Sequence, residues 1–303
     1  MNFLHYYGPT SILFSIGSID IHWYGLLMAI AILAGLLVSI KIARWHEIKS
    51  ETIYDLFFYV IIGGFIGARI FYILYNPGYF WQYPLDMFKI WQGGIAIHGA
   101  LVFGILVIFW FARRLPPVET KQPRIETRQC LVSTTTDKFF LLSAIIAPGL
   151  ALGQAIGRWG NYFNQEVFGW PTSLSWGIPI NPINRPTGFE QFSYFHPTFL
   201  YESIGDLIIF IVLLLLHKWI IKHKKYPISL PCRQAGNIQY PILVTASYLL
   251  LYSTLRFFME FLRIDPTAGS IGGVRVTMIL AFLGVIFSLG LWLYYNIKRT
   301  GTS

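Results

Sequence analysis

The chain has 303 residues, of which 55% are hydrophobic and only 12% are charged. Soluble domains usually contain about one quarter charged residues, so this composition excludes an ordinary soluble protein and predicts a polytopic membrane protein. The net charge of +9 does not indicate a nucleic-acid-binding protein, because the lysines and arginines lie mostly in a few short loops. Its two cysteines, Cys130 and Cys232, lack metal-ligand spacing, which argues against a zinc site or a disulfide.

Seven apolar segments are long enough to cross the hydrocarbon core of a bilayer as helices of about 20 residues. They cover residues 22–42, 54–75, 95–112, 139–157, 198–217, 239–261 and 275–296. We therefore expect an all-α polytopic membrane protein that forms a single transmembrane domain over residues 1–303. No internal repeat is visible, which argues against transporters built from inverted repeats.

The loops alternate in positive charge, and this alternation predicts the orientation in the membrane. Lysines and arginines are frequent after the first, third, fifth and seventh segments, including the loops 113–138 and 218–238. The loop 76–94, by contrast, contains only Lys89. Because positively charged loops remain in the cytoplasm, we expect the N-terminus outside and the C-terminus in the cytoplasm.

Three long connections stand out by composition. Residues 158–197 are rich in tryptophan and proline, which predicts a small ordered head region on the periplasmic side. The stretches 116–137 and 224–237 are polar, aperiodic and contain proline, so we expect flexible insertions on the cytoplasmic side.

Polar side chains gather in GRWGNYFNQEVFG, residues 157–169, where a long apolar run ends. Polar groups near a bilayer are costly, so a cluster of them indicates a function. The amides and the carboxylate bring hydrogen-bonding groups, the arginine brings a fixed cation with a forked array of donors, and the glycines let the backbone approach a ligand. The simpler alternative is a helix cap beside an arginine that extends to the interface. The residues concerned are Arg158, Asn161, Asn164, Glu166 and Gly169.

A second polar set lies within the sixth apolar segment. Tyr252, Arg256 and Glu260 are spaced four residues apart, so they share one face of a helix. An internal ion pair between Arg256 and Glu260 is the structural alternative, and it is compatible with a function. Arg158 and Arg256 together indicate an anionic ligand, because guanidinium groups bind phosphate through paired hydrogen bonds. Tyr24 adds a hydroxyl, although a place in the aromatic belt explains it equally well.

Histidines and a further arginine occur in or beside the other segments. His98, in GGIAIHGAL at the start of the third segment, is a candidate proton acceptor, with a satisfied core histidine as the alternative. We expect Arg69 to be mainly architectural, paired with Glu202 or Asp206.

The motifs together resemble the prolipoprotein diacylglyceryl transferases, a family of bacterial membrane enzymes. Besides residues 157–169 and the Tyr252 series, the resemblance rests on four segments in the family's order. They are HWYG at 22–25, GARI at 67–70, GGIAIHG at 93–99 and HPTFLYE at 196–202. The resemblance implies transfer of a diacylglyceryl group from phosphatidylglycerol to the lipobox cysteine of a prolipoprotein signal peptide, with release of glycerol phosphate. It also implies a place in the bacterial inner membrane, with the active face toward the periplasm.

With this resemblance, each candidate residue receives a role. His98, Arg158 and Arg256 are expected to be catalytic, and no metal or organic cofactor is needed. Substrate binding is expected from Tyr24, Asn161, Asn164, Glu166, Gly169, Tyr252 and Glu260. The sequence contains no GxSxG, HExxH, P-loop or CxxC motif, so the nucleophile is expected to arrive with the substrate. A multi-pass transporter and another phospholipid-processing enzyme are the alternatives.

Overall fold

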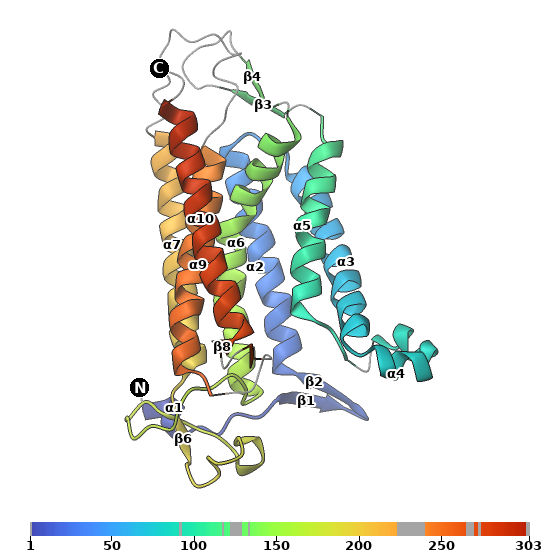
Figure 1. Ribbon diagram of the computed structural model, residues 1–303, viewed down its shortest axis with the longest axis vertical. Coiled ribbons are helices and arrows are strands. Elements are labelled where there is room, and N and C mark those ends of the chain that lie inside the picture. The colour runs from blue at the N-terminus through green and yellow to red at the C-terminus, as the bar shows by residue number, and fades with distance from the viewer. Residues whose placement is uncertain are drawn as a thin grey trace. The chain divides into compact units, whose positions relative to one another are not determined.

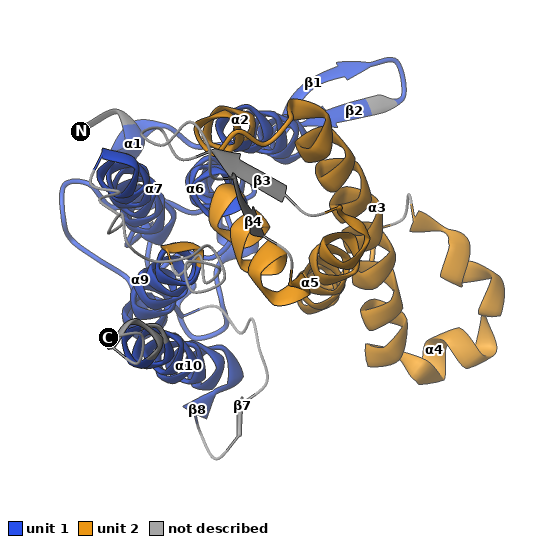
Figure 2. Ribbon diagram, turned by 90° about the horizontal axis from the view of Figure 1, so that it is seen from above, with its two compact units in different colours: residues 1–39, 146–225, 242–303 blue, residues 40–145, 226–241 orange. Residues whose placement is uncertain are grey.

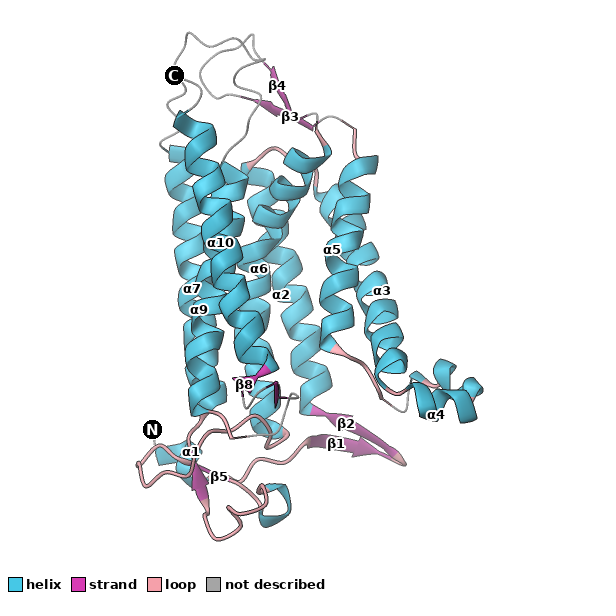
Figure 3. Cartoon of the chain, in the orientation of Figure 1, coloured by secondary structure: helices cyan, strands magenta, loops and turns pink. Residues whose placement is uncertain are grey.

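The computed structural model describes residues 2–90, 93–116, 118–121, 129–132, 134–222, 240–264, 270–271 and 274–300. Within these ranges, helices dominate and the strands form short two-stranded antiparallel pairs (Figure 3). Seven of the described helices are long and apolar enough to cross a membrane, which confirms the all-α polytopic class. They are α2 (Trp23–Trp45), α3 (Ser50–Tyr75), α5 (Ile97–Arg114), α6 (Thr135–Phe163), α7 (Thr198–Lys222), α9 (Tyr240–Leu262) and α10 (Val276–Thr300).

The chain divides into two compact units, which are coloured separately in Figure 2. Unit 1 comprises residues 1–39, 146–225 and 242–303, and unit 2 comprises residues 40–145 and 226–241. The expected single transmembrane domain stays a prediction.

In unit 1, the helices α7, α9 and α10 run side by side with the parts of α2 and α6 that belong to this unit, residues 23–39 and 146–163 (Figure 1). Small residues allow close approach of their backbones. A Cβ atom at Gly149 of α6 would lie only 2.5 Å from the carbonyl oxygen of Gly35 on α2. Between α6 and α7, the Ser203 hydroxyl donates a hydrogen bond of 2.8 Å to the carbonyl of Ala155. Such contacts are typical of membrane helices, which lack a hydrophobic force between them and rely on close packing and hydrogen bonds.

Short elements collect at one end of the unit 1 helices, where α2, α7 and α10 begin and α6 and α9 end (Figure 1). They include α1 (Asn2–Tyr6), β1 (Ile12–Ile16), β2 (Ile19–His22), β5 (Ile178–Pro179), η3 (Pro182–Asn184), β6 (Tyr194–Phe195), β7 (Ser270–Ile271) and β8 (Val274–Arg275). A core of Tyr162, Phe168, Ile178, Phe195 and Phe199 packs the segment after α6 against the start of α7. We call residues 164–197 the head segment. The expected head began at residue 158, but α6 continues to Phe163 and so carries Arg158 and Asn161 on a helix.

Unit 2 contains a helical hairpin of α3 and α5. Gly67 and Gly99 face each other at its crossing, where a Cβ atom on either residue would overlap the backbone of the other helix. The connection between the two helices contains α4 (Pro77–Gln82) and η1 (Pro84–Phe88). In this connection, hydrogen bonds from Lys89 and Tyr79 lower the pKa of the half-buried Asp86 carboxyl, because both stabilise its ionised form.

The guanidinium group of Arg69, on α3, is hydrogen bonded to main-chain carbonyls of this connection. All five N–H donors of a guanidinium are used, and every acceptor is a main-chain carbonyl. The acceptors belong to Asp86, Met87, Lys89, Gly93 and Gly94, at distances between 2.5 and 3.4 Å. The architectural role expected for Arg69 is therefore correct, but the expected partners, Glu202 and Asp206, are wrong: five carbonyls leave no donor for a carboxylate.

The first expected insertion, residues 116–137, contains two paired strands that its aperiodic sequence did not predict. Strands β3 (Val118–Lys121) and β4 (Gln129–Val132) pair in an antiparallel register, and Cys130 lies in β4. The second insertion, residues 224–237 with Cys232, lies outside the described residues.

Candidate functional site

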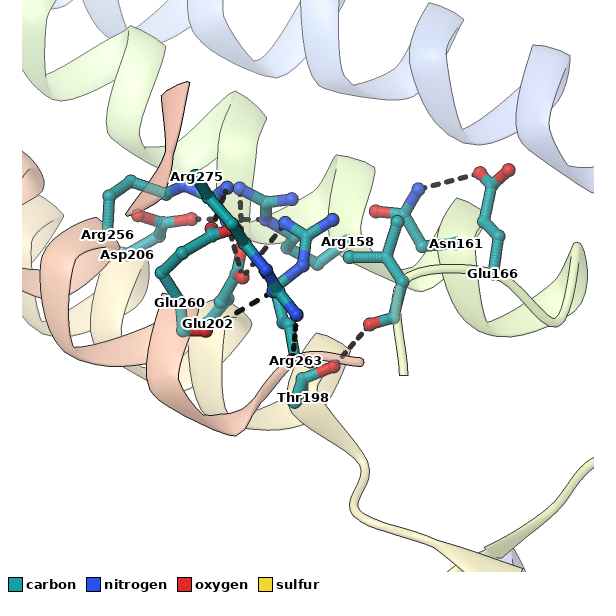
Figure 4. A network of polar contacts seen from close by, with 11 residues as sticks. Arg158, Asn161, Glu166, Thr198, Glu202, Asp206, Arg256, Glu260, Arg263 and Arg275 are labelled. Atoms are coloured by element: carbon teal, nitrogen blue, oxygen red, sulfur yellow. Dashed lines mark hydrogen bonds and ion pairs between the residues drawn. The ribbon is translucent and has the colours of Figure 1, made fainter. Parts of the chain in front are cut away.

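Charged side chains from four elements of unit 1 converge at the end of the bundle that carries the head segment (Figure 4). Arg158 comes from α6, Glu202 and Asp206 from α7, and Arg256 and Glu260 from α9. Arg263 follows α9 directly, and Arg275 lies in β8. The spacing of four residues between Glu202 and Asp206, and between Arg256 and Glu260, places each pair on one helix face. We call these seven residues the arginine cluster.

Glu202 is the centre of the cluster, and only 1% of its side chain is exposed. Its Oε2 atom lies 2.5 Å from Nη2 of Arg158, and its Oε1 atom accepts a hydrogen bond of 2.7 Å from Nη1 of Arg256. Nη1 of Arg263 lies 3.9 Å from the same Oε1 atom. A buried carboxylate is stable only when it is paired and hydrogen bonded, and here arginines from α6 and α9 meet that requirement.

Glu260 forms a second centre. It pairs with Arg256 one turn earlier at 3.2 Å and with Arg275 at 3.2 Å. Nη2 of Arg275 also donates a hydrogen bond of 2.8 Å to the carbonyl of Arg263. Strand β8 is thereby fixed to the end of α9. The ion pair between Arg256 and Glu260, the alternative considered for this helix face, is present.

The cluster has an excess of positive charge. Its four guanidinium groups face three carboxylates, which leaves one formal positive charge. The third carboxylate, Asp206, is fully buried and lies 3.9 Å from Nε of Arg158. Arginines held in fixed positions at the end of a helical bundle are suited to bind an anion, above all a phosphate with its several acceptor oxygens.

Beside the cluster, the turn after α6 displays Glu166. Asn161 donates a hydrogen bond of 2.7 Å to Oε1 of Glu166, and Asn164 lies 3.4 Å from the same atom. Both residues flanking Glu166 have left-handed backbone angles, with φ of +52° at Gln165 and +59° at Val167. A positive φ is uncommon for a residue other than glycine, and for a β-branched valine it is a strained conformation that the surrounding contacts must hold.

The contacts that hold this turn come from the head segment, the N-terminus and α7. Gln165 is buried, and its amide donates a hydrogen bond of 2.7 Å to the carbonyl of Pro9. Its side-chain oxygen accepts hydrogen bonds from the backbone of Asn181 at 2.8 Å and from the side chain of Asn184 at 3.2 Å. The carbonyl of Val167 accepts a hydrogen bond from the Thr198 hydroxyl (Figure 4).

The other predicted residues of unit 1 lie around these two groups. The Tyr24 ring packs against the backbone at Gly160, and its hydroxyl interacts electrostatically with Glu166 and Arg158. Tyr252, one turn before Arg256, interacts in the same way with both arginines. Gly169 lies against the carbonyl of Leu262, where a Cβ atom would approach to 2.6 Å. This close contact explains why a glycine occupies the position.

His98 lies in unit 2. It is the second residue of α5, is half-buried, and makes an edge-to-face contact with Tyr75 at 6.5 Å between ring centroids. The structure therefore brings Arg158, Arg256, Glu260, Tyr252 and Tyr24 together within unit 1, while His98 belongs to the other unit.

Sequence reasoning missed four members of the cluster: Glu202, Asp206, Arg263 and Arg275. Two carboxylates four residues apart in an apolar helix, and an arginine three residues after Glu260, were available signals. Nothing in the local sequence of Arg275 points to the cluster, because a turn brings it back to α9. Over the described ranges, the structure shows no group of three or more His, Cys, Asp or Glu side chains that could hold a metal ion.

Comparison with known proteins adds an independent finding. The family model described as prolipoprotein diacylglyceryl transferase matches residues 11–294. A phosphatidylglycerol–prolipoprotein diacylglyceryl transferase of Parasynechococcus marenigrum is 38% identical, over 94% of this chain and 93% of that protein. The protein of the same name from Synechococcus elongatus is 37% identical, over 97% of this chain and 89% of its own length. The one from Acaryochloris marina is 38% identical, over 96% and 93%.

Proposed function

Because the chain belongs to the prolipoprotein diacylglyceryl transferase family, we propose that the arginine cluster binds the phosphate of the donor lipid. The chain is a multi-pass membrane enzyme that transfers the diacylglyceryl group of phosphatidylglycerol to a prolipoprotein, the first step of lipoprotein maturation. Membership in a transferase family also decides between this activity and the transporter considered from the sequence.

Negative charge develops on a phosphate oxygen during the transfer step, and the enzyme must stabilise it. The sulfur of the lipobox cysteine attacks the glycerol carbon that carries the phosphate ester, and a thioether bond forms as the carbon–oxygen bond breaks. The electron pair leaves on the phosphate oxygen, so that glycerol phosphate departs with increased negative charge. Donors that are already in place where this charge develops lower the barrier, because they need no reorganisation during the step.

The observation that carries this proposal is that Arg158 and Arg256 both bind Glu202. Two guanidinium groups from separate helices are thereby held on one buried carboxylate, at 2.5 and 2.7 Å. Each guanidinium has five N–H donors. The contacts of Arg158 with Glu202 and Asp206, and those of Arg256 with Glu202 and Glu260, use only part of them. We assign the remaining donors to the phosphate oxygens of phosphatidylglycerol.

The neighbouring polar residues receive supporting roles in this proposal. Asn161, Asn164 and Glu166 would bind the glycerol head group, whose hydroxyls need both donors and acceptors. Tyr24, Tyr252 and Glu260 would hold the lipid and the arginines, while Gly169 keeps the turn packed against α9. For the thiol proton we propose His98, because an imidazole accepts a proton near neutral pH. The loop charges support an inner-membrane location, with the N-terminus and this end of unit 1 toward the periplasm.

Mass spectrometry tests the activity directly. The purified protein, in vesicles that contain phosphatidylglycerol, is incubated with a lipobox peptide. We expect a diacylglyceryl adduct on the peptide cysteine and one glycerol phosphate for each adduct. A peptide with serine in place of that cysteine is the control. Release of glycerol phosphate without an adduct would indicate a lipid hydrolase and contradict the proposal.

A further inference from the structure

Glu202 is fixed between the two helices whose arginines it binds. One residue along α7, Ser203 is hydrogen bonded to the backbone of α6 at 2.8 Å. Three residues along, Gly205 faces Leu255 of α9 so closely that a Cβ atom would approach the leucine side chain to 2.6 Å. The α7 backbone thus packs closely against both neighbours, and Glu202 presents one oxygen to each side.

The two oxygens have different partners, and this division determines where the guanidinium groups lie. Oε2 faces Arg158, and Oε1 faces Arg256 with Arg263 further away. Without the carboxylate, like charges on α6 and α9 would repel each other, and each long side chain would regain several rotamers. With it, both groups are fixed before any substrate arrives.

We propose that Glu202 is a positioning residue, which holds Arg158 and Arg256 at the spacing that the transfer step requires. The inference rests on the proposed role of these arginines as phosphate ligands. Glu202 does not need to touch the substrate, because only 1% of its side chain is exposed, whereas the side chains of Arg158 and Arg256 are 17% and 16% exposed. Its effect is on the rate of the step, since a misplacement of about 1 Å in a catalytic group costs about 10²-fold.

Removing the charge of Glu202 should also change the affinity for the anionic substrate, and this effect is favourable where the effect on the rate is unfavourable. Replacing Glu202 with glutamine raises the formal excess of the cluster from one positive charge to two. More positive charge attracts an anionic ligand in its ground state, even where the groups are poorly placed for the transition state. A positioning role therefore predicts a lower kcat together with unchanged or lower KM for phosphatidylglycerol, and stronger inhibition by glycerol phosphate. A merely structural role predicts less folded protein with normal kinetics for the folded part.

Thr245 supplies the control. It lies near the start of α9, whereas Arg256 lies near the end of that helix, and it is buried outside the arginine cluster. Kinetics are measured for Glu202→Gln, Thr245→Val and Arg158→Lys, each normalised to folded protein from its thermal transition. We expect Glu202→Gln to lose about 10²-fold in kcat without a rise in KM. Thr245→Val replaces a buried hydroxyl with a methyl group and changes no charge, so this variant should stay close to wild type.

Each outcome decides a separate point. Wild-type kcat in folded Glu202→Gln, or an equal loss in Glu202→Gln and Thr245→Val, would overturn the positioning role. Near-normal activity in Arg158→Lys would instead overturn the proposed phosphate site itself. If Glu202→Gln does not fold, Glu202→Asp replaces it, since that variant keeps the charge but cannot span both arginines. Normal kcat in folded Glu202→Asp would likewise contradict the inference.

Discussion

The side-chain amide of Asn161 donates a hydrogen bond of 2.7 Å to the carboxylate of Glu166, five residues further along the chain. This contact spans the end of α6 and requires the chain to turn back sharply. The turn has positive φ at Gln165 and Val167. The local conformation that displays Glu166 is therefore maintained by contacts outside the turn, and chiefly by the buried side chain of Gln165.

Substitution of Gln165 tests this relationship. Gln165→Ala removes three hydrogen bonds and keeps an unfavourable φ, and each buried polar group left without a partner costs about 1–3 kcal/mol. Gln165→Gly loses the same bonds but tolerates the positive φ, which relieves about 1–2 kcal/mol. We expect thermal stability in detergent to fall in the order wild type, Gln165→Gly, Gln165→Ala. An alanine variant as stable as the glycine variant would show that backbone strain at this residue is negligible.

Arg69 is predicted to control the order of the connection in unit 2. Lysine has three donors in place of five, so Arg69→Lys must leave carbonyls of residues 86–94 without partners. We expect faster amide hydrogen exchange at residues 84–90, with α5 itself unchanged. Arg114→Lys is the control, because Arg114 lies at the other end of α5 and stacks on Trp110 at 4.7 Å. Equal exchange in the two variants would contradict the role given to Arg69.

The pH dependence of His98→Gln tests the proton acceptor. If His98 takes the thiol proton, the variant should lose about 10²–10⁴-fold in rate near neutral pH. The loss should shrink as the pH rises toward the thiol reference pKa of about 8.5, because solvent then supplies thiolate. The measurement is a pH–rate profile of both proteins from about pH 6 to 9.5. Parallel profiles would assign proton transfer to another group, with Glu166 or Glu260 the next candidates.

Cysteine labelling in intact cells tests the proposed orientation. Cys130 and Cys232 lie in the loops expected to be cytoplasmic, so a membrane-impermeant thiol reagent should reach them only after lysis. Ser173→Cys places a thiol on an exposed position of the head segment, and this variant should react from outside. Labelling of Cys130 in intact cells, with Ser173→Cys protected, would reverse the orientation.

The membrane spans could be predicted from the sequence because length and hydropathy alone determine them. The end of α6 could not, since Arg158 and Asn161 suggested a loop and yet continue the helix. The hairpin of β1 and β2 was missed, although Gly17 and Ser18 form the two-residue turn typical of such hairpins. The turn signal at Gly17 and Ser18 was present in the sequence, but it lies beside the long apolar segment 22–42, which dominated the interpretation of this region.

Within the site, single residues were easier to predict than their partners. Arg158, Arg256 and Glu260 were found because charge in an apolar segment is costly and therefore noticeable. Their common partner, Glu202, was assigned to Arg69, because pairing depends on how α6, α7 and α9 meet. That arrangement is a property of tertiary packing, and spacing along one helix does not contain it.

The most direct test of the phosphate site replaces each central arginine with lysine and keeps the charge. Arg158→Lys and Arg256→Lys lose the forked donor geometry, so each should reduce transfer to the lipobox peptide by about 10²–10³-fold. Arg185→Lys is the control, because Arg185 is hydrogen bonded to carbonyls of the head segment, outside the cluster. The measurement is kcat/KM for phosphatidylglycerol, per folded enzyme, in all three variants. Loss in the two cluster variants with normal activity in Arg185→Lys is the predicted result, and near-wild-type transfer by both cluster variants would contradict it.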